Sequence, residues 1–95
     1  MAPEGKVKAA VKKILTEAGA WYCTPLGAGY GRAGVPDFIV CHRGKFVAIE
    51  CKAGKGKTTA LQDRELAAIG GAGGHTFVIR EDGLGYLKTM LKDCV

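Results

Sequence analysis

Hydrophobic residues near the start of the chain recur at intervals of three and four positions. The members of this stripe are Val7, Ala10, Val11, Ile14, Leu15 and Ala18. Lys8, Lys12, Lys13 and Glu17 lie between them, so the segment has one apolar face and one charged face. Such spacing is typical of a surface helix that packs one side against a core. The pattern predicts a helix over about residues 4–18, ended by Gly19.

The middle of the chain changes to runs that are rich in β-branched and aromatic residues. Residues 37–41 and 46–52 are two such runs, and the polar segment 42–45 separates them, with Gly44 near its tip. Short apolar runs joined by a polar turn that contains glycine are typical of a β-hairpin. The pattern therefore predicts two antiparallel strands across residues 37–52.

Shorter signals predict the remaining elements. They are a strand at 20–23, a helix at about 59–69, a strand at 76–79 and a helix at about 84–92 that Asp82 caps. The element order is then α-β-β-β-α-β-α. Because a helix joins the last two strands, these strands should pair in parallel through a right-handed crossover. We therefore expect an α/β fold with a mixed β-sheet flanked by helices, in a single domain over residues 1–95.

Three ionisable residues, Asp37, Glu50 and Lys52, interrupt the predicted hairpin. Burying a charge costs several kcal/mol unless it is paired or bound to a metal ion. If the turn consists of Arg43 and Gly44 alone, Asp37 lies opposite Glu50 with Cβ atoms roughly 4.5–5.5 Å apart. Lys52 then points to the same face, about 6.6 Å further along the strand. A three-residue turn with Gly44 in a bulge is the alternative, since Arg43 disfavours positive φ, and it shifts the register by one.

Two carboxylates that face each other suit a small divalent cation with oxygen ligands. Without a cation they repel, and one of them should have a raised pKa. Simpler explanations exist for each residue. Asp37 follows Pro36 and could be only a turn residue, and Glu50 with Lys52 could be a surface ion pair worth at most about 1 kcal/mol.

Composition adds a basic balance to this picture. The 95 residues carry a net charge of +5, with a pI near 9.2 and 47% hydrophobic residues. A positive charge of this size favours a polyanionic partner. The four cysteines lack the short spacing of a zinc site. No secretion signal and no apolar run of about 18 residues is evident, so we expect a reduced, cytoplasmic protein without a membrane span.

The motif residues resemble a known family. Pro36-Asp37, twelve further residues and Glu50-Cys51-Lys52 resemble the signature of the PD-(D/E)xK nuclease superfamily. Gly34 three residues before Asp37, and Gln62 downstream of Lys52, look like the VRR-NUC family of virus-type replication–repair nucleases. The resemblance covers nearly the whole chain. It implies a restriction-endonuclease-like fold and a metal-dependent DNA endonuclease.

The resemblance also implies roles for the hairpin residues. Asp37, Glu50 and the main-chain carbonyl of Cys51 would ligate Mg²⁺ or Mn²⁺. Such an ion lowers the pKa of a bound water and neutralises charge on the phosphodiester. Lys52 would orient the attacking water or stabilise the transition state electrostatically.

Two further catalytic candidates lie on helices. Gln62 would help to position Lys52, water or phosphate, but Thr59 and Gln62 also fit a capping box, and one amide should not serve both roles fully at once. Glu4 matches an acid near the start of the first helix in the family pattern and would make an outer-sphere or second-metal contact. Glu4 could equally be an acid that the helix dipole favours.

Other residues are candidates for contact with nucleic acid. Lys55 and Lys57 follow the hairpin and suit phosphate binding. Tyr30 and Arg32, in a glycine-rich loop, could stack on bases or bind phosphate. We expect Trp21 and Tyr22 in the core or at an interface. His42 and His75 are expected to be solvated turn residues.

Small stand-alone members of the family look similar to Holliday-junction-resolving enzymes, which act as homodimers on branched DNA. A chain this small offers little surface for duplex recognition alone, which also favours a homodimer. Flap cutting or nicking is an alternative within the family. A non-enzymatic basic nucleic-acid-binding module is a second possibility, and an endonuclease-like assembly subunit is a third.

Overall fold

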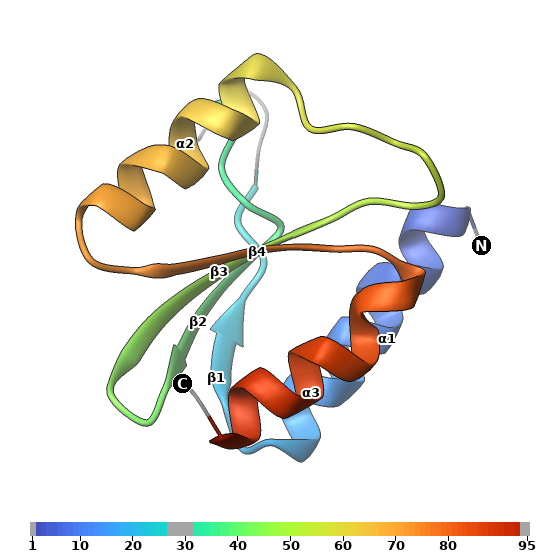
Figure 1. Cartoon of the computed structure of the whole chain (residues 1–95), viewed down its shortest axis with the longest axis vertical. Coiled ribbons are helices and arrows are strands. Elements are labelled where there is room, and N and C mark those ends of the chain that lie inside the picture. The colour runs from blue at the N-terminus through green and yellow to red at the C-terminus, as the bar shows by residue number, and fades with distance from the viewer. Residues whose placement is uncertain (1, 27–31, 94–95) are drawn as a thin grey trace.

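The computed structural model describes residues 2–26 and 32–93 (Figure 1). In chain order the elements are α1 (Pro3–Glu17), β1 (Trp21–Cys23), β2 (Phe38–His42), β3 (Lys45–Cys51), α2 (Ala60–Gly71), β4 (His75–Ile79), the 3₁₀ turn η1 (Glu81–Gly83) and α3 (Leu84–Asp93). The predicted order α-β-β-β-α-β-α is confirmed. Asp82 lies inside η1, so the prediction that it caps the last helix is wrong.

The four strands form one mixed sheet with the order β1-β2-β3-β4. The pairs β1–β2 and β2–β3 are antiparallel, whereas β3 and β4 are parallel. Helix α2 connects the parallel pair, as the crossover argument requires. The predicted mixed sheet is therefore confirmed.

The turn between β2 and β3 consists of two residues. His42 pairs with Lys45, and both residues between them have positive φ, 52° at Arg43 and 78° at Gly44. A two-residue turn with two positive φ angles matches the twist of the flanking strands. The guanidinium of Arg43 donates a hydrogen bond to the carbonyl oxygen of Lys92 at 2.8 Å, so its side chain links the turn to the end of α3. The register is therefore that of the two-residue turn, without a bulge.

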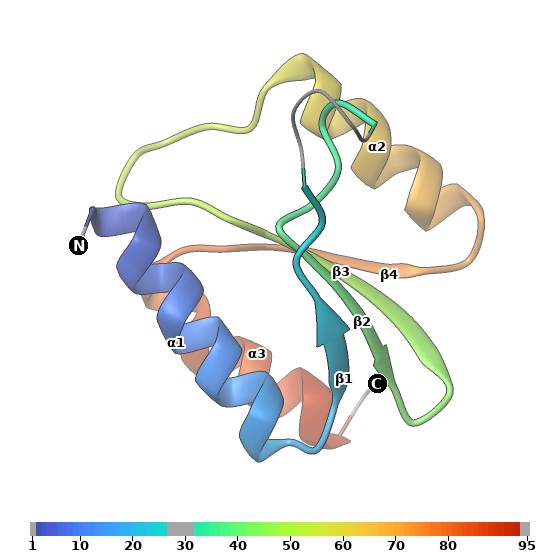
Figure 2. The same cartoon turned by 180° about the vertical axis from the view of Figure 1, so that it is seen from behind.

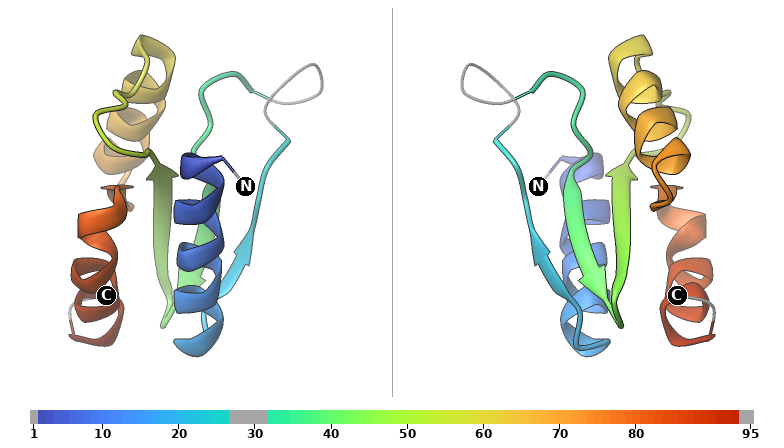
Figure 3. Two further views of the ribbon diagram at one scale, coloured as in Figure 1. Left: turned by 90° about the vertical axis from the view of Figure 1, so that its right-hand side faces the viewer. Right: turned by 90° about the vertical axis from the view of Figure 1, so that its left-hand side faces the viewer.

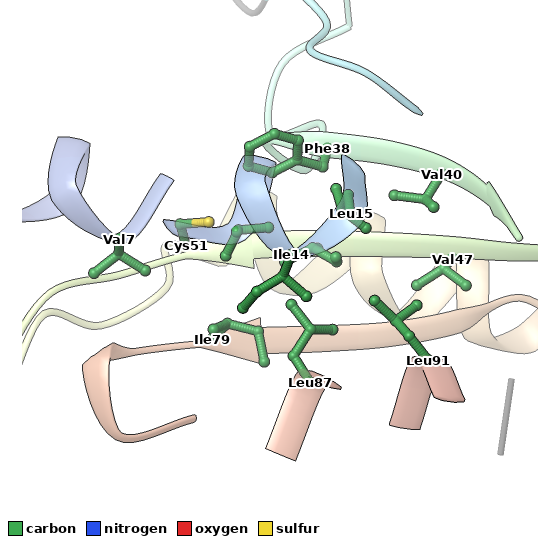
Figure 4. Packing of buried hydrophobic residues seen from close by; sticks show 12 residues of the cluster. Val7, Ile14, Leu15, Phe38, Val40, Val47, Cys51, Ile79, Leu87 and Leu91 are labelled. Atoms are coloured by element: carbon green, nitrogen blue, oxygen red, sulfur yellow. The ribbon is translucent and has the colours of Figure 1, made fainter. Parts of the chain in front are cut away.

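Helices α1 and α3 cover one face of the sheet, and α2 lies on the other (Figures 1 and 2). Side chains from both helices and from alternate strand positions form the core (Figure 4). This cluster is Val7, Val11, Ile14, Leu15, Phe38, Val40, Val47, Ile49, Cys51, Ile79, Leu87 and Leu91. Within the described residues, no helix is both long enough and apolar enough to cross a membrane.

The expectation that both histidines are solvated turn residues is wrong, and Trp21 does not lie in the core, so its place at an interface stays a prediction. His42 lies in β2 and is only 4% exposed, and its Nε2 atom is 2.7 Å from the carbonyl oxygen of Leu91. His75 begins β4 and is partly buried. Trp21 is 61% exposed because β1 is an edge strand and this side chain points away from the core. Tyr22, on the other face of β1, packs edge-on against Phe38.

Candidate active site

The candidate site lies where β2 begins and β3 ends. Phe38 pairs with Ile49, so Asp37 lies opposite Glu50, one step further along the hairpin. The Oδ2 atom of Asp37 accepts a hydrogen bond from the main-chain N–H of Cys51 at 2.8 Å. The two acids therefore face each other across neighbouring strands, in the arrangement expected from the two-residue turn.

Gly34 brings the start of this motif close to α2. It has a φ of 80°, and a Cβ atom added to it would lie 2.6 Å from the main-chain carbon and oxygen of Leu61. Both the conformation and the close approach require glycine. Figure 3 shows the chain that enters β2 at the same end of the molecule as α2. This contact places Asp37 and the first turn of α2 around the same region.

Glu50 is the most buried acid of the site, with 2% of its surface exposed. Its Oε2 atom lies 3.7 Å from the ammonium of Lys52 and accepts a hydrogen bond from Nε2 of Gln62 at 3.1 Å. Its Oε1 atom is buried and has no hydrogen-bond partner among the described residues. Burial, and then the charge of Asp37, raise the pKa of Glu50 to about 7. A buried acid with one oxygen unpartnered is the environment that a bound cation would relieve.

Gln62 serves two partners at the same time. The side-chain oxygen of Gln62 accepts a hydrogen bond from the main-chain N–H of Thr59 at 2.9 Å. The main-chain N–H of Gln62 donates to the Thr59 hydroxyl at 3.2 Å, which completes a capping box. Its amide nitrogen remains available and donates to Glu50. The amide oxygen and nitrogen are separate groups, so capping leaves the nitrogen free to contact Glu50. A role of Gln62 in positioning Lys52, water or phosphate stays a prediction.

Lys8 of α1 also reaches the site, and the sequence reasoning missed it. Its ammonium is 3.4 Å from Oδ1 of Asp37 and 3.4 Å from Oε2 of Glu4. Burial disfavours the charged form of Lys8, but Asp37 and Glu4 outweigh burial and raise its pKa. The available signal was the spacing of Glu4 and Lys8, four residues apart on one helix, which predicts a pair. Glu4 therefore touches the site through Lys8.

The residues fit a hard divalent cation with few protein ligands. Within residues 2–26 and 32–93, no group of three or more His, Cys, Asp or Glu side chains gathers as a metal-ligand set. The two facing acids are a pair, and Glu50 supplies an unpartnered oxygen. Mg²⁺ typically takes one or two carboxylates and keeps several waters, so a carboxylate pair is sufficient for it.

Lys55 and Lys57 lie exposed in the loop between β3 and α2 (Figure 1). This loop is tied to the end of β4. The carboxylate of Glu81 accepts a hydrogen bond from the main-chain N–H of Gly54 at 2.9 Å. The guanidinium of Arg80 donates a hydrogen bond to the main-chain carbonyl of Gly56 at 2.7 Å. The two lysines therefore extend from a loop that is held in place by hydrogen bonds to Arg80 and Glu81.

Arg32 has a different neighbour from the one expected. Its guanidinium forms an ion pair with Glu65 of α2, which is 5% exposed. The Arg32 side chain is itself 70% exposed, so it neutralises a buried acid and still presents a face to solvent. Tyr30, its predicted companion in nucleic-acid contact, lies outside the described residues.

Comparison with solved structures identifies the fold. No protein-family model and no curated protein matches this chain. A solved structure described as a VRR_NUC domain is similar with a TM-score of 0.80 and 24% sequence identity, over 100% of each chain. At this identity the likeness establishes the architecture, including the restriction-endonuclease-like sheet flanked by helices. The chain therefore has the fold of a VRR-NUC domain.

Proposed function

We propose that this chain is a metal-dependent DNA endonuclease of the VRR-NUC family, with its single nuclease domain over residues 1–95. The observation that carries the proposal is the buried carboxyl group of Glu50. It faces Asp37, has one unpartnered oxygen and lies beside the ammonium of Lys52. A purely structural acid would normally have both oxygens hydrogen-bonded at this depth.

Asp37, Glu50 and the main-chain carbonyl of Cys51 would hold Mg²⁺ or Mn²⁺. When bound, the ion lowers the pKa of a water molecule and neutralises charge on the phosphodiester. The side-chain amide of Gln62 donates to one oxygen of Glu50, and the other oxygen, which has no described partner, would be available to ligate the ion. Lys8 neutralises Asp37 from the side of α1, and Glu4 holds Lys8 there.

Lys52 is the residue that we assign to the reaction itself. Its side chain is only 12% exposed, so its charge acts in a partly desolvated environment. A fixed positive charge in such a place stabilises the negative charge that develops on the phosphoryl oxygens. The same ammonium can orient the attacking water. Loss of Lys52 should slow cleavage and leave the acid pair intact.

The DNA substrate is proposed to be branched, with Lys55, Lys57 and Arg32 as contacts for its backbone. Tyr30, which lies outside the described residues, is a further candidate contact. A homodimer would place two metal sites on two strands of a junction. Sedimentation velocity measures whether the protein is a dimer in solution. A flap or nicking activity would use the same site with a different DNA geometry.

The test incubates the protein with linear, nicked, flapped and four-way DNA, with Mn²⁺ and with chelator. Lys52→Ala should cleave about 10²–10³-fold more slowly than wild type, as expected for the loss of one transition-state stabiliser. Lys45→Ala is the matched control, since Lys45 is an exposed lysine at the far end of β3. Cleavage that survives chelation, or a Lys52→Ala variant as active as the control, would contradict the mechanism. Binding without any cleavage would favour the non-enzymatic module.

A further inference from the structure

A hollow of about 450 Å³ lies beside the candidate site, between α1 and the chain that enters β2. Figure 2 shows α1 on one side of this region and β1 with β2 on the other. Its lining includes Asp37 at one end, Lys8 and Lys12 of α1, and Thr24 after β1. Gly5 and Ala9 also line it, and their small size leaves the space beside the two lysines open.

The two lysines of the hollow differ in their partners. Lys8 is already paired with Asp37 and Glu4. Lys12 is exposed, and in the described part of the chain no carboxylate oxygen lies within 4.0 Å of its ammonium. The hollow is therefore lined by one ammonium group without a carboxylate partner among the described residues, and also by Thr24, which carries a hydroxyl group. This combination suits an anionic oxygen of a ligand.

We propose that this hollow binds the sugar–phosphate backbone of the DNA strand next to the bond that is cut, with Lys12 as its phosphate contact. Residues four apart on a helix lie about 5–6 Å apart. Lys12 lies one helical turn from Lys8 on α1, so we expect it to meet a phosphate that neighbours the one nearest Lys8. The position relative to the cut rests on the proposed function, whereas the backbone contact does not.

The neighbouring Lys13 provides a matched control. It is exposed like Lys12, and none of the described carboxylates lies within 4.0 Å of its ammonium. However, Lys13 lines a different hollow, together with Glu17 and Lys88. Lys12→Ala and Lys13→Ala remove the same charge from adjacent positions of one helix. A general effect of net charge would weaken DNA binding equally in both variants.

The experiment measures binding of a labelled DNA duplex by fluorescence anisotropy in chelator, so that no cleavage occurs, over a range of salt concentrations. Lys12→Ala should reduce the slope of log K against log salt by about 0.9, the value for one phosphate contact on duplex DNA, and should weaken binding about fivefold at 0.1 M salt. Lys13→Ala should keep the wild-type slope, and Lys12→Arg should restore it. Circular dichroism verifies that the variants are folded, and Lys12→Gln replaces Lys12→Ala if that variant is not.

Equal slopes for Lys12→Ala and Lys13→Ala would overturn the inference, even if wild type cleaves DNA with Mn²⁺. A difference between the two variants supports the backbone contact. If that difference appears while wild type fails to cleave, the proposed catalytic function fails and the binding hollow stands. The two outcomes are therefore distinguishable.

Discussion

The carboxyl group of Glu50 has two oxygens with different surroundings, one held by Gln62 and Lys52 and the other buried without a partner among the described residues. The same burial affects the protonation of Glu50. Burial and the nearby Asp37 raise the pKa of Glu50 to about 7 from the usual 4.5, so the folded protein binds this proton more tightly than the unfolded chain. The contribution to stability is fully present below pH 4.5 and is lost as the pH rises through about 7.

Glu50→Gln should therefore stabilise the metal-free protein at high pH. At pH 8 in chelator its free energy of unfolding should exceed that of wild type by about 1–3 kcal/mol, because one pKa unit corresponds to about 1.4 kcal/mol. The difference should shrink toward pH 5, where wild-type Glu50 is protonated. Thermal unfolding at several pH values measures it, with Glu17→Gln, an exposed acid of α1, as control. Parallel curves for wild type and Glu50→Gln would show that Glu50 is not a strained acid.

At the scale of elements, the approach of the β2 entry to α2 determines whether the catalytic candidates meet. Gly34 packs against the main chain of Leu61, and the next residue of α2, Gln62, reaches Glu50. The N-terminus of α2 and the chain that enters the β2–β3 hairpin are therefore in close contact at Gly34. A side chain at position 34 would push them apart.

Gly34→Ala should destabilise the protein by about 2–4 kcal/mol and slow DNA cleavage, because both the clash and the positive φ act against the folded state. Gly44→Ala is the matched control, since Gly44 has a φ of 78° but no atom within 4 Å of an added Cβ. This control should cost about 1 kcal/mol and leave cleavage unchanged. Chemical denaturation and the junction-cleavage assay measure the two effects. Equal costs for both variants would mean that the contact with Leu61 does not position α2.

At the scale of the whole molecule, the net charge of +5 is unevenly distributed around the candidate site. The loop that carries Lys55 and Lys57 leads from β3 to α2, and α1, which carries Lys8 and Lys12, packs on the face of the sheet opposite α2 (Figure 1). Positive charge on both sides of an acid pair attracts a phosphate backbone and brings it to the site. The acids themselves repel that backbone until a cation neutralises them.

Replacing Lys55 and Lys57 together by alanine should weaken binding to all DNA structures to a similar degree. The salt slope of binding should fall by up to about 1.8, the value for two phosphate contacts. Cleavage at saturating protein should stay near the wild-type rate, since neither lysine lies in the acid pair. Single-turnover cleavage and anisotropy separate the two effects. A loss of cleavage at saturation would place this loop in the catalytic machinery.

Several features could be predicted from local sequence because their causes are local. The helical stripe, the polar turn and the capping box each depend on residues a few positions apart, so the element order and the parallel crossover follow from them. The facing acids also follow, because the register of a hairpin is set by its turn. The positive φ of Arg43, 52°, was not evident from local sequence, because arginine disfavours this conformation.

Local residue patterns are enough to predict which elements form, which residues alternate across the sheet, and that two acids and a lysine share one region of the hairpin. The contacts of Lys8 with Asp37, of His42 with Leu91 and of Arg32 with Glu65 become evident only in the folded molecule. These contacts join distant segments, so they depend on how the helices are placed and rotated on the sheet. That placement results from the packing of the whole core, which no local pattern of residues encodes.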